Sequence, residues 1–224
     1  MDTSVPKQMI DLIRAERQRR ALMALQLADE NSDLASDVWQ FRDEPLVNEL
    51  CLILLVAVWH QVEREVISLA ARVTSDGKQI TREQYLGNLD RTEGEWRYKR
   101  SRGKVIRKLD LDRFPKWESS IKTLNLLANC YKHDSTKTPG TMLLEHLRLD
   151  VTQRCMPLHE SSYLRKGLAA SVGLPEGAAF CDIAEELLAS AATFLVEIQT
   201  AAEQTGRLST WGPVDFGDPG FYAG

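Results

Sequence analysis

The chain has 224 residues, of which 43% are hydrophobic and 27% are charged, and its formal net charge at pH 7 is −4. This balance allows a buried core and excludes a chain that is disordered throughout. The slight acidic excess excludes a general attraction to nucleic acid, so any contact with RNA or DNA needs a local basic patch.

Cysteine spacing and apolar run length narrow the class of protein further. The four cysteines form no Cys-x-x-Cys pair, so neither a zinc site nor a disulfide framework is predicted, and each is expected to be a small core residue in a reducing cytosol. His146, Cys155 and His159 match no compact metal-ligand spacing. The longest apolar run, 51–59, is too short for a bilayer that needs about twenty residues. We therefore expect a cytoplasmic protein with no membrane span, metal or cofactor.

Two long helices are predicted near the N-terminus. Residues 4–30 carry an interrupted apolar stripe, and residues 43–74 pass through the apolar run and continue with apolar residues at helical spacing. His60, Glu63 and Arg64 share one face of the second helix, because they stand at positions i, i+3 and i+4.

The segment 79–115 is predicted to be a connector with one short or irregular helical element. It holds the only strongly basic stretch, 95–108, in which seven Lys or Arg residues are interleaved with Trp96 and Tyr98. Such a patch can bind phosphates and stack bases, although charge runs also form solvated surfaces. The residues expected to contact RNA are Arg97, Lys99, Arg100, Arg102 and Lys104.

Two more helices are predicted in the second half of the chain. Apolar side chains recur at helical spacing over 116–133, and a last long helix is predicted over 176–205. Residues 207–224 are rich in Gly, Pro and aromatic residues, which indicates a non-helical tail that packs on its own domain or on a partner. The predicted fold class is all-α, a bundle of about four long helices plus short connecting helices in a single domain, 1–206.

The two central predicted helices contain the stretches "LLVAVWHQVEREVISL" and "LNLLANCYKHDSTKTPG". In these stretches the chain resembles the HEPN superfamily (higher eukaryotes and prokaryotes nucleotide-binding), and by helix order the resemblance covers 45–205. The second stretch is similar in particular to that of bacterial HEPN-like proteins in which this helix ends in Asn-x-x-Lys-His. The resemblance implies a helical bundle, a homodimer and a metal-independent ribonuclease of a bacterial defence or toxin–antitoxin system, with RNA and an antitoxin or defence-system protein as partners.

The resemblance also implies a set of catalytic residues. RNA cleavage without a metal uses the ribose 2′-hydroxyl as nucleophile and needs a base, an acid and a cation near the developing charge. His133 matches the family's histidine as base or acid, and Asn129 and Lys132 match the narrower motif as orienting group and phosphate-facing cation. The family's usual arginine is missing from this helix, so Arg64 of the neighbouring helix is the expected second cation.

Other interpretations of the same residues stay open. The missing arginine is also typical of a non-catalytic HEPN-like module that binds nucleic acid or a partner protein. A plain helical interaction protein is the third alternative. A histidine at a helix C-terminus stabilises the helix through its interaction with the helix dipole, so its position there does not require a catalytic role. His60 and Glu63 are expected to support the site, with Glu63 orienting a histidine, or else to belong to a surface ion-pair patch.

Overall fold

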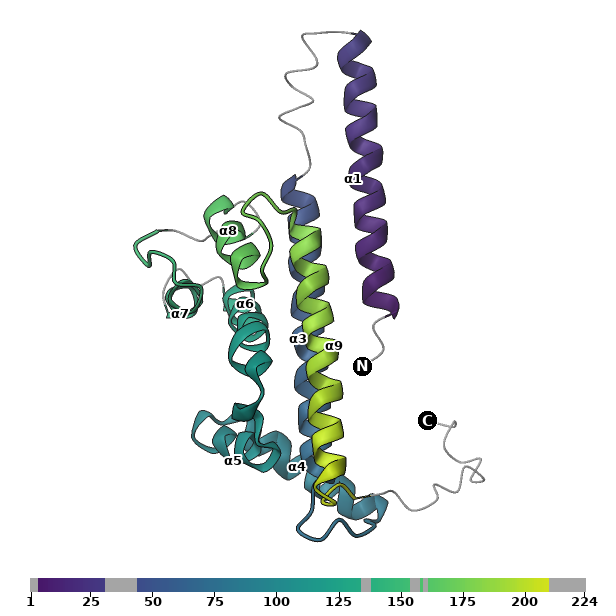
Figure 1. Cartoon of the computed structure of the whole chain (residues 1–224), viewed down its shortest axis with the longest axis vertical. Helices are drawn as coiled ribbons and strands as arrows, with labels where there is room; N and C mark the ends of the chain where they lie inside the picture. The colour runs from purple at the N-terminus through teal and green to yellow at the C-terminus, as the bar shows by residue number, and fades with distance from the viewer. Residues whose placement is uncertain (1–3, 31–43, 134–137, 154–157, 159–160, 210–224) are drawn as a thin grey trace, which may run out of the picture. The chain divides into compact units, whose positions relative to one another are not determined.

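The computed structural model describes residues 4–30, 44–133, 138–153, 158 and 161–209. These residues are mostly helical and contain no β-strand, which confirms the all-α part of the prediction (Figure 1). Their helical elements are α1 (Ser4–Glu30), α3 (Glu44–Arg72), α4 (Arg82–Arg97), α5 (Lys99–Leu109), η1 (Leu111–Arg113), η2 (Trp117–Ile121), α6 (Lys122–His133), α7 (Thr138–His146), α8 (Ser162–Ser171) and α9 (Phe180–Gln204).

The four long helices predicted from apolar periodicity are present. α1 and α3 match the helices predicted over 4–30 and 43–74, and α9 matches the last one. The helix predicted over 116–133 consists of η2, which is a π-helical turn, followed directly by α6. Apolar residues at helical spacing, interrupted in α1, therefore predicted each of these helices to within a few residues.

The prediction of a connector with one short or irregular helical element over 79–115 is wrong in its helical content, because this segment folds into two helices, α4 and α5. At the start of α4 the Thr81 hydroxyl accepts a hydrogen bond from the Gln84 N–H at 3.2 Å, and the Gln84 side chain accepts one from the Thr81 N–H at 2.9 Å. α5 buries Val105 and Leu109, one turn apart. Six of its eleven residues are Lys or Arg, so the apolar stripe is too narrow to predict a helix from sequence.

The chain divides into two compact units, and each is discontinuous in sequence. The first comprises Met1–Val62 and Pro115–Phe194, and the second comprises Glu63–Phe114 and Leu195–Gly224. α3 and α9 therefore contribute residues to both units. The predicted single domain over 1–206 stays a prediction.

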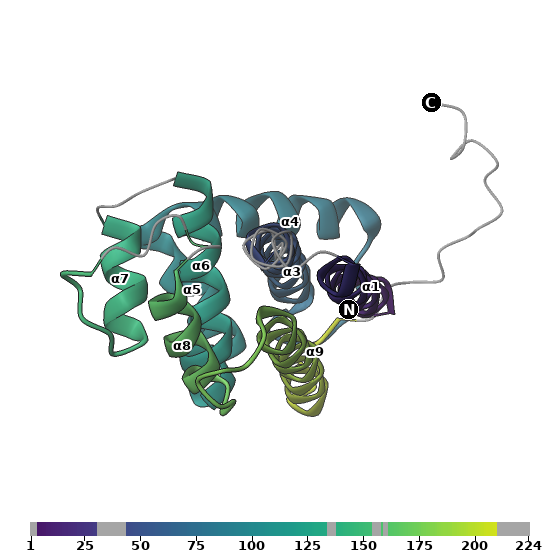
Figure 2. The ribbon, with the colours of Figure 1, turned by 90° about the horizontal axis from the view of Figure 1, so that it is seen from above.

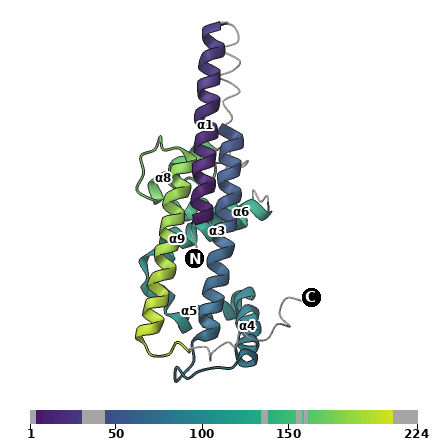
Figure 3. The ribbon, with the colours of Figure 1, turned by 90° about the vertical axis from the view of Figure 1, so that its right-hand side faces the viewer.

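In the first unit, α3 and α9 run side by side in the same direction (Figure 2 and Figure 3). α1 lies along one side of this pair and buries Ile10 and Ile13, while α6, α7 and α8 stand on the side away from α1 (Figure 2). Arg14 of α1 forms ion pairs with Asp182 at 2.6 Å and with Glu185 at 2.7 Å, both near the start of α9. Apolar burial and these ion pairs together fix α1 to the first unit.

In the second unit, α4 packs against the last turns of α3. The Trp96 indole N–H donates a hydrogen bond to Glu63 at 2.7 Å, and the Asn88 amide donates one to the Ala71 carbonyl at 3.3 Å. Trp96 is 2% exposed, so its indole N–H needs this partner inside the fold. Because the chain passes directly from α4 into α5, these contacts also help to hold α5 in the second unit.

The segment after α9 pairs with the end of α3. The Thr74 N–H donates to the Arg207 carbonyl at 2.9 Å, and the Ser209 N–H donates to the Arg72 carbonyl at 3.0 Å. The start of the predicted tail, 207–209, thus belongs to the second unit. The rest of the tail, 210–224, which contains its aromatic residues, lies outside the described residues.

Among the described helices, α3 alone is long and apolar enough to cross a membrane. The qualifying stretch is Leu46–Arg72, and half of its most apolar window is buried within the fold. The core helix of a soluble protein meets the same criterion, so length and composition do not decide between the two environments. The absence of a membrane span stays a prediction.

Two glycines of the second unit provide a matched stability test. Gly77 has a φ of +63°, and a Cβ added there would overlap the Gly206 carbonyl oxygen. Gly77→Ala should therefore lower the free energy of unfolding by at least about 2 kcal/mol in urea titrations. Gly87 lies inside α4 with open space where a Cβ would stand, so Gly87→Ala should raise it by about 0.5–1 kcal/mol. Equal effects of the two substitutions would contradict the close approach of Gly77 and Gly206.

Candidate functional site

The end of α6 carries three of the predicted site residues. His133 is the last residue of the helix and is exposed, as is Lys132 before it. Asn129 is half-buried one turn earlier, and its amide N–H donates to the Asn125 side-chain oxygen at 2.8 Å. The polar turn at 134–137 lies outside the described residues. The helix end thus presents a histidine and a lysine to solvent, preceded by a bonded pair of asparagines.

α6 is held in place by a hydrogen bond to α7. The Thr123 hydroxyl donates to the Ser119 carbonyl at 3.0 Å, and Nε2 of His146 lies 3.0 Å from the same hydroxyl oxygen. Because a hydroxyl has only one proton to donate, Nε2 of His146 is the donor in this second contact. Burial lowers the pKa of His146, although a hydrogen bond to the Ser119 backbone acts in the opposite direction. His146 is therefore a neutral structural residue for the helix that ends at His133.

A second polar contact fixes the rotation of the last turn of α6. The Tyr131 hydroxyl donates to Glu49 of α3 at 2.6 Å. This bond raises the pKa of Tyr131, because loss of the phenolic proton would place two negative charges side by side. Since Tyr131 directly precedes Lys132 and His133, the contact with α3 helps to set the directions in which these two residues leave the helix.

The remaining predicted residues of the catalytic set lie on α3. His60 is half-buried in the first unit, while Glu63 and Arg64 belong to the second. Arg64 is exposed, and Glu63 accepts the hydrogen bond of the Trp96 indole. The structure thus gives Glu63 a structural partner, and it places Arg64 and His133 in different units. A site shared by Arg64 and His133 stays a prediction.

Arg102, one of the predicted RNA-binding residues, packs inside the second unit. Its guanidinium carbon lies 5.0 Å from the centroid of the Trp96 ring, and its Nε donates to the Trp96 carbonyl at 2.9 Å. A cation over an indole face stabilises both groups. Arg102 and Trp96 therefore connect α5 to α4, and the Trp96 ring is too deeply buried to stack on a base. The side chain of Lys99 lies outside the described residues.

The other predicted cations stand on the surface of the second unit. Arg97 is paired with Glu93, and Lys104 lies 3.5 Å from Glu95. Exposed ion pairs contribute only about 0–1 kcal/mol, so both cations can exchange a carboxylate for a phosphate at small cost. Arg100 is exposed on the first turn of α5. These three side chains remain available to an anionic ligand.

The structure adds two cations, Arg91 and Arg207, to the basic stretch that the sequence indicated. Both lie near Lys108 of that stretch, which is half-buried. Burial lowers the pKa of Lys108, the charges of Arg91 and Arg207 lower it further, and Glu95 opposes them. Arg91 and Lys78 also line an open hollow of about 540 Å³. The cluster joins α4, α5 and the segment after α9, and no sequence pattern indicates that residue 207 lies near the other two.

Comparisons with known proteins leave the site to be argued from its own residues. No family model, no curated protein and no solved structure matches this chain. Within the described ranges, no group of three or more His, Cys, Asp or Glu side chains is arranged to hold a metal ion. Membership of the HEPN superfamily therefore stays a prediction from the sequence.

His146 makes stability depend on pH. Its pKa is lowered from the ordinary value of 6.5 in the folded protein, so the unfolded chain binds this proton more readily. The contribution to the free energy of unfolding is present above pH 6.5 and is lost as the pH falls toward the folded-state pKa. Urea unfolding between about pH 5 and pH 8 should show this decline, and His146→Gln should flatten it.

Thr123→Val serves as the control for this prediction. It removes the hydrogen-bond partner and keeps the histidine, so stability should fall at every pH while the decline below pH 6.5 persists. An NMR titration in which the His146 ring protonates at or above pH 6.5 would contradict the assignment.

Proposed function

We propose that this protein is an HEPN-like helical module that binds RNA through the basic face of α5. The observation that carries the proposal is the division of α5 into two sides. Val105 and Leu109 are buried, and the helix has six Lys or Arg residues and no acidic residue. The burial of the apolar pair fixes the rotation of the helix, so the exposed cations Arg100, Lys104 and Arg107 are held outward whether or not a ligand is bound.

Three exposed cations of α5 are aligned for a nucleic-acid backbone. Arg100, Lys104 and Arg107 stand at positions i, i+4 and i+7, so they share one face and span about 10 Å of the helix axis. Neutralised phosphates release their counterions, which makes such binding strong at low salt and weak at high salt. The sequence-independent part of RNA binding is expected to come from this face.

Tyr98 supplies an aromatic surface beside these cations. It directly precedes α5 and is 71% exposed, in contrast to Trp96, which is 2% exposed. Stacking of an unpaired base on an exposed aromatic ring contributes about 1–3 kcal/mol and tolerates any base. An exposed tyrosine beside a cationic face favours single-stranded RNA over a duplex, whose bases are stacked on each other.

The helix end at His133 supports the wider setting of the proposal. An Asn-x-x-Lys-His end is similar to that of bacterial HEPN-like proteins, which makes a defence or toxin–antitoxin system the proposed context. A homodimer, an antitoxin or defence-system partner and a cytoplasmic location belong to the same proposal, and they rest on the sequence resemblance alone.

Neutralising the α5 face should weaken RNA binding. The triple variant Arg100→Gln, Lys104→Gln and Arg107→Gln should lower affinity for single-stranded RNA by at least about tenfold at low salt, measured by fluorescence anisotropy. The slope of log Kd against log salt should fall by about two, since each lost phosphate contact on a single strand removes about 0.7.

A matched control variant has the same net charge as the α5 triple variant. Lys7→Gln, Lys122→Gln and Lys166→Gln remove three exposed cations of the first unit, and this variant should bind RNA as the wild type does. Equal losses in the two triple variants would mean that net charge, and no particular surface, governs binding. An unchanged affinity in the α5 variant would reject the proposal.

A metal-independent ribonuclease is the second candidate, and the exposed end of α6 favours it. Lys132 and His133 share the last turn and are both exposed, so a proton-transfer group and a cation can reach one phosphodiester. Asn129 is bonded to Asn125 one turn earlier along the helix. Orientation of His133 by Asn129 would require this bond to open, which makes the asparagine the weakest member of the predicted set.

His133→Ala tests the second candidate. In EDTA, the wild type should cleave a mixed RNA to fragments ending in 2′,3′-cyclic phosphate, and the variant should cleave at least about a hundredfold more slowly. Lys122→Ala, at the other end of α6, should retain the wild-type rate. Binding of the RNA without cleavage by the folded wild type would reject the nuclease and leave the binding module in place.

A further inference from the structure

Two cysteines that are distant in sequence meet in the core of the first unit. The Sγ atoms of Cys51 on α3 and Cys181 on α9 are 3.4 Å apart, although 130 positions separate the residues. Both side chains are buried, at 0% and 1% exposed. A disulfide has an S–S distance of about 2.05 Å, so the sulfur atoms need to approach by only about 1.4 Å.

The surroundings of the pair favour a thiolate on one of the two sulfurs. Cys181 is the second residue of α9, where the partial positive charge of the helix N-terminus stabilises an anion. The pKa of Cys181 is lowered by its hydrogen bond with Cys51 and by the nearby charges of Arg17 and Arg14. The same bond and burial raise the pKa of Cys51. Cys181 is therefore the first of the pair to lose its proton.

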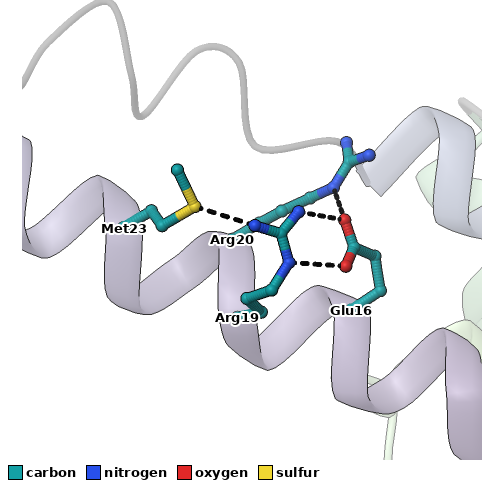
Figure 4. A network of polar contacts seen from close by, with 4 residues as sticks. All are labelled: Glu16, Arg19, Arg20 and Met23. Carbon is teal, nitrogen blue, oxygen red and sulfur yellow. Dashed lines mark hydrogen bonds and ion pairs between the residues drawn. The ribbon is translucent and has the colours of Figure 1, made fainter.

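α1 lies alongside α9, the helix that carries Cys181 (Figure 2). Arg14, whose charge acts on both cysteines, is anchored to Asp182 and Glu185 in the first two turns of α9. Farther along α1, Arg19 forms its hydrogen bonds to Glu16 and Met23 of the same helix (Figure 4). Arg14 thus attaches α1 to α9 beside Cys181, whereas the bonds of Arg19 stay within α1.

We propose that Cys51 and Cys181 form a reversible disulfide that ties α3 to α9, and that α1 controls the access of the oxidant. With a small disulfide such as oxidised glutathione, the Cys181 thiolate attacks one sulfur and releases the first glutathione thiolate. Cys51 then loses its proton and attacks the Cys181 sulfur of the mixed disulfide, which releases the second. Two protein thiols lose two electrons and two protons, and one small disulfide becomes two thiols.

The cross-link can be tested on the full chain. We would incubate the protein with oxidised glutathione, block remaining thiols with N-ethylmaleimide and map peptides by mass spectrometry without reductant. A peptide pair joined through Cys51 and Cys181, which dithiothreitol releases and which the Cys51→Ala variant lacks, is the expected result. The oxidised wild type should also melt about 5–10 °C higher than the reduced form.

Two outcomes would overturn the cross-link. In the first, Cys51 and Cys181 of the folded protein remain unlinked, although the same oxidant has fully oxidised the exposed thiols of a reference peptide. The other is oxidation that stops at glutathionylated Cys181, because the resolving step would then be missing. Cys181→Ala provides a second variant without the link if Cys51→Ala does not fold.

A pair of arginine variants tests the role of α1. Arg14→Gln removes the anchor to α9 and should accelerate formation of the link by about five- to tenfold, because local opening of α1 becomes more frequent. This effect should outweigh the loss of the Arg14 charge, since Arg14 is a smaller cause of the lowered Cys181 pKa than the Cys51 hydrogen bond and Arg17. Arg19→Gln changes the same charge on the same helix and should leave the rate unchanged. Equal rates in the two variants would overturn the control by α1, while the peptide map would still decide the cross-link.

Discussion

The burial of α3 is the constraint on which the first unit depends. Leu52, Leu54, Val58 and Trp59 are each at most 4% exposed, and at the helical rotation of about 100° per residue they spread over about 160° of the circumference. A buried face of this width cannot be covered by one neighbouring helix. α9 lies along it, with α1 on one side and α6 to α8 on the other (Figure 2). Since each large side chain stabilises by about 1.5–3 kcal/mol when fully buried, the other helices are positioned chiefly by this requirement.

Polar contacts then select one arrangement of the helices around that core. The bond between Tyr131 and Glu49 fixes the rotation of α6 against α3, and the contact between Thr123 and His146 fixes α7 against α6. Each of these bonds involves a partly buried group, so an alternative packing would leave a donor or acceptor unpaired at a cost of about 1–3 kcal/mol. Apolar burial brings the helices together, and the polar pairs decide their register.

Sequence periodicity predicted α3, α6 and α9, each of which buries a wide apolar face, and it failed at α5, where charged residues surround a narrow one. α5 has only Val105 and Leu109 as fully buried apolar anchors, and its six cations conceal the helical pattern. The roles of individual side chains were less predictable, because they depend on partners distant in the chain. Arg102 and Trp96 matched a nucleic-acid patch by composition, yet the fold uses them to hold α5 to α4.

Long-range juxtapositions were beyond sequence reasoning altogether. Nothing in the local sequence indicates that Arg207 lies near Lys108, or that Cys51 meets Cys181. The candidate residues at the end of α6 were easier to find, since Asn129, Lys132 and His133 are close in sequence and share the last turns of one helix. The α5 face and the α6 end belong to different units, so their contributions to any RNA interaction can be separated by substitution.

The discontinuous composition of both units has a consequence for the order of folding during synthesis. The first unit needs residues up to Phe194 before its core is complete, and the second needs the segment that reaches Ser209 and pairs with Arg72. Neither unit can therefore close while the first half of the chain is still leaving the ribosome. The apolar surface of α3 has to wait for α9, which makes the nascent chain dependent on protection from aggregation until late in translation.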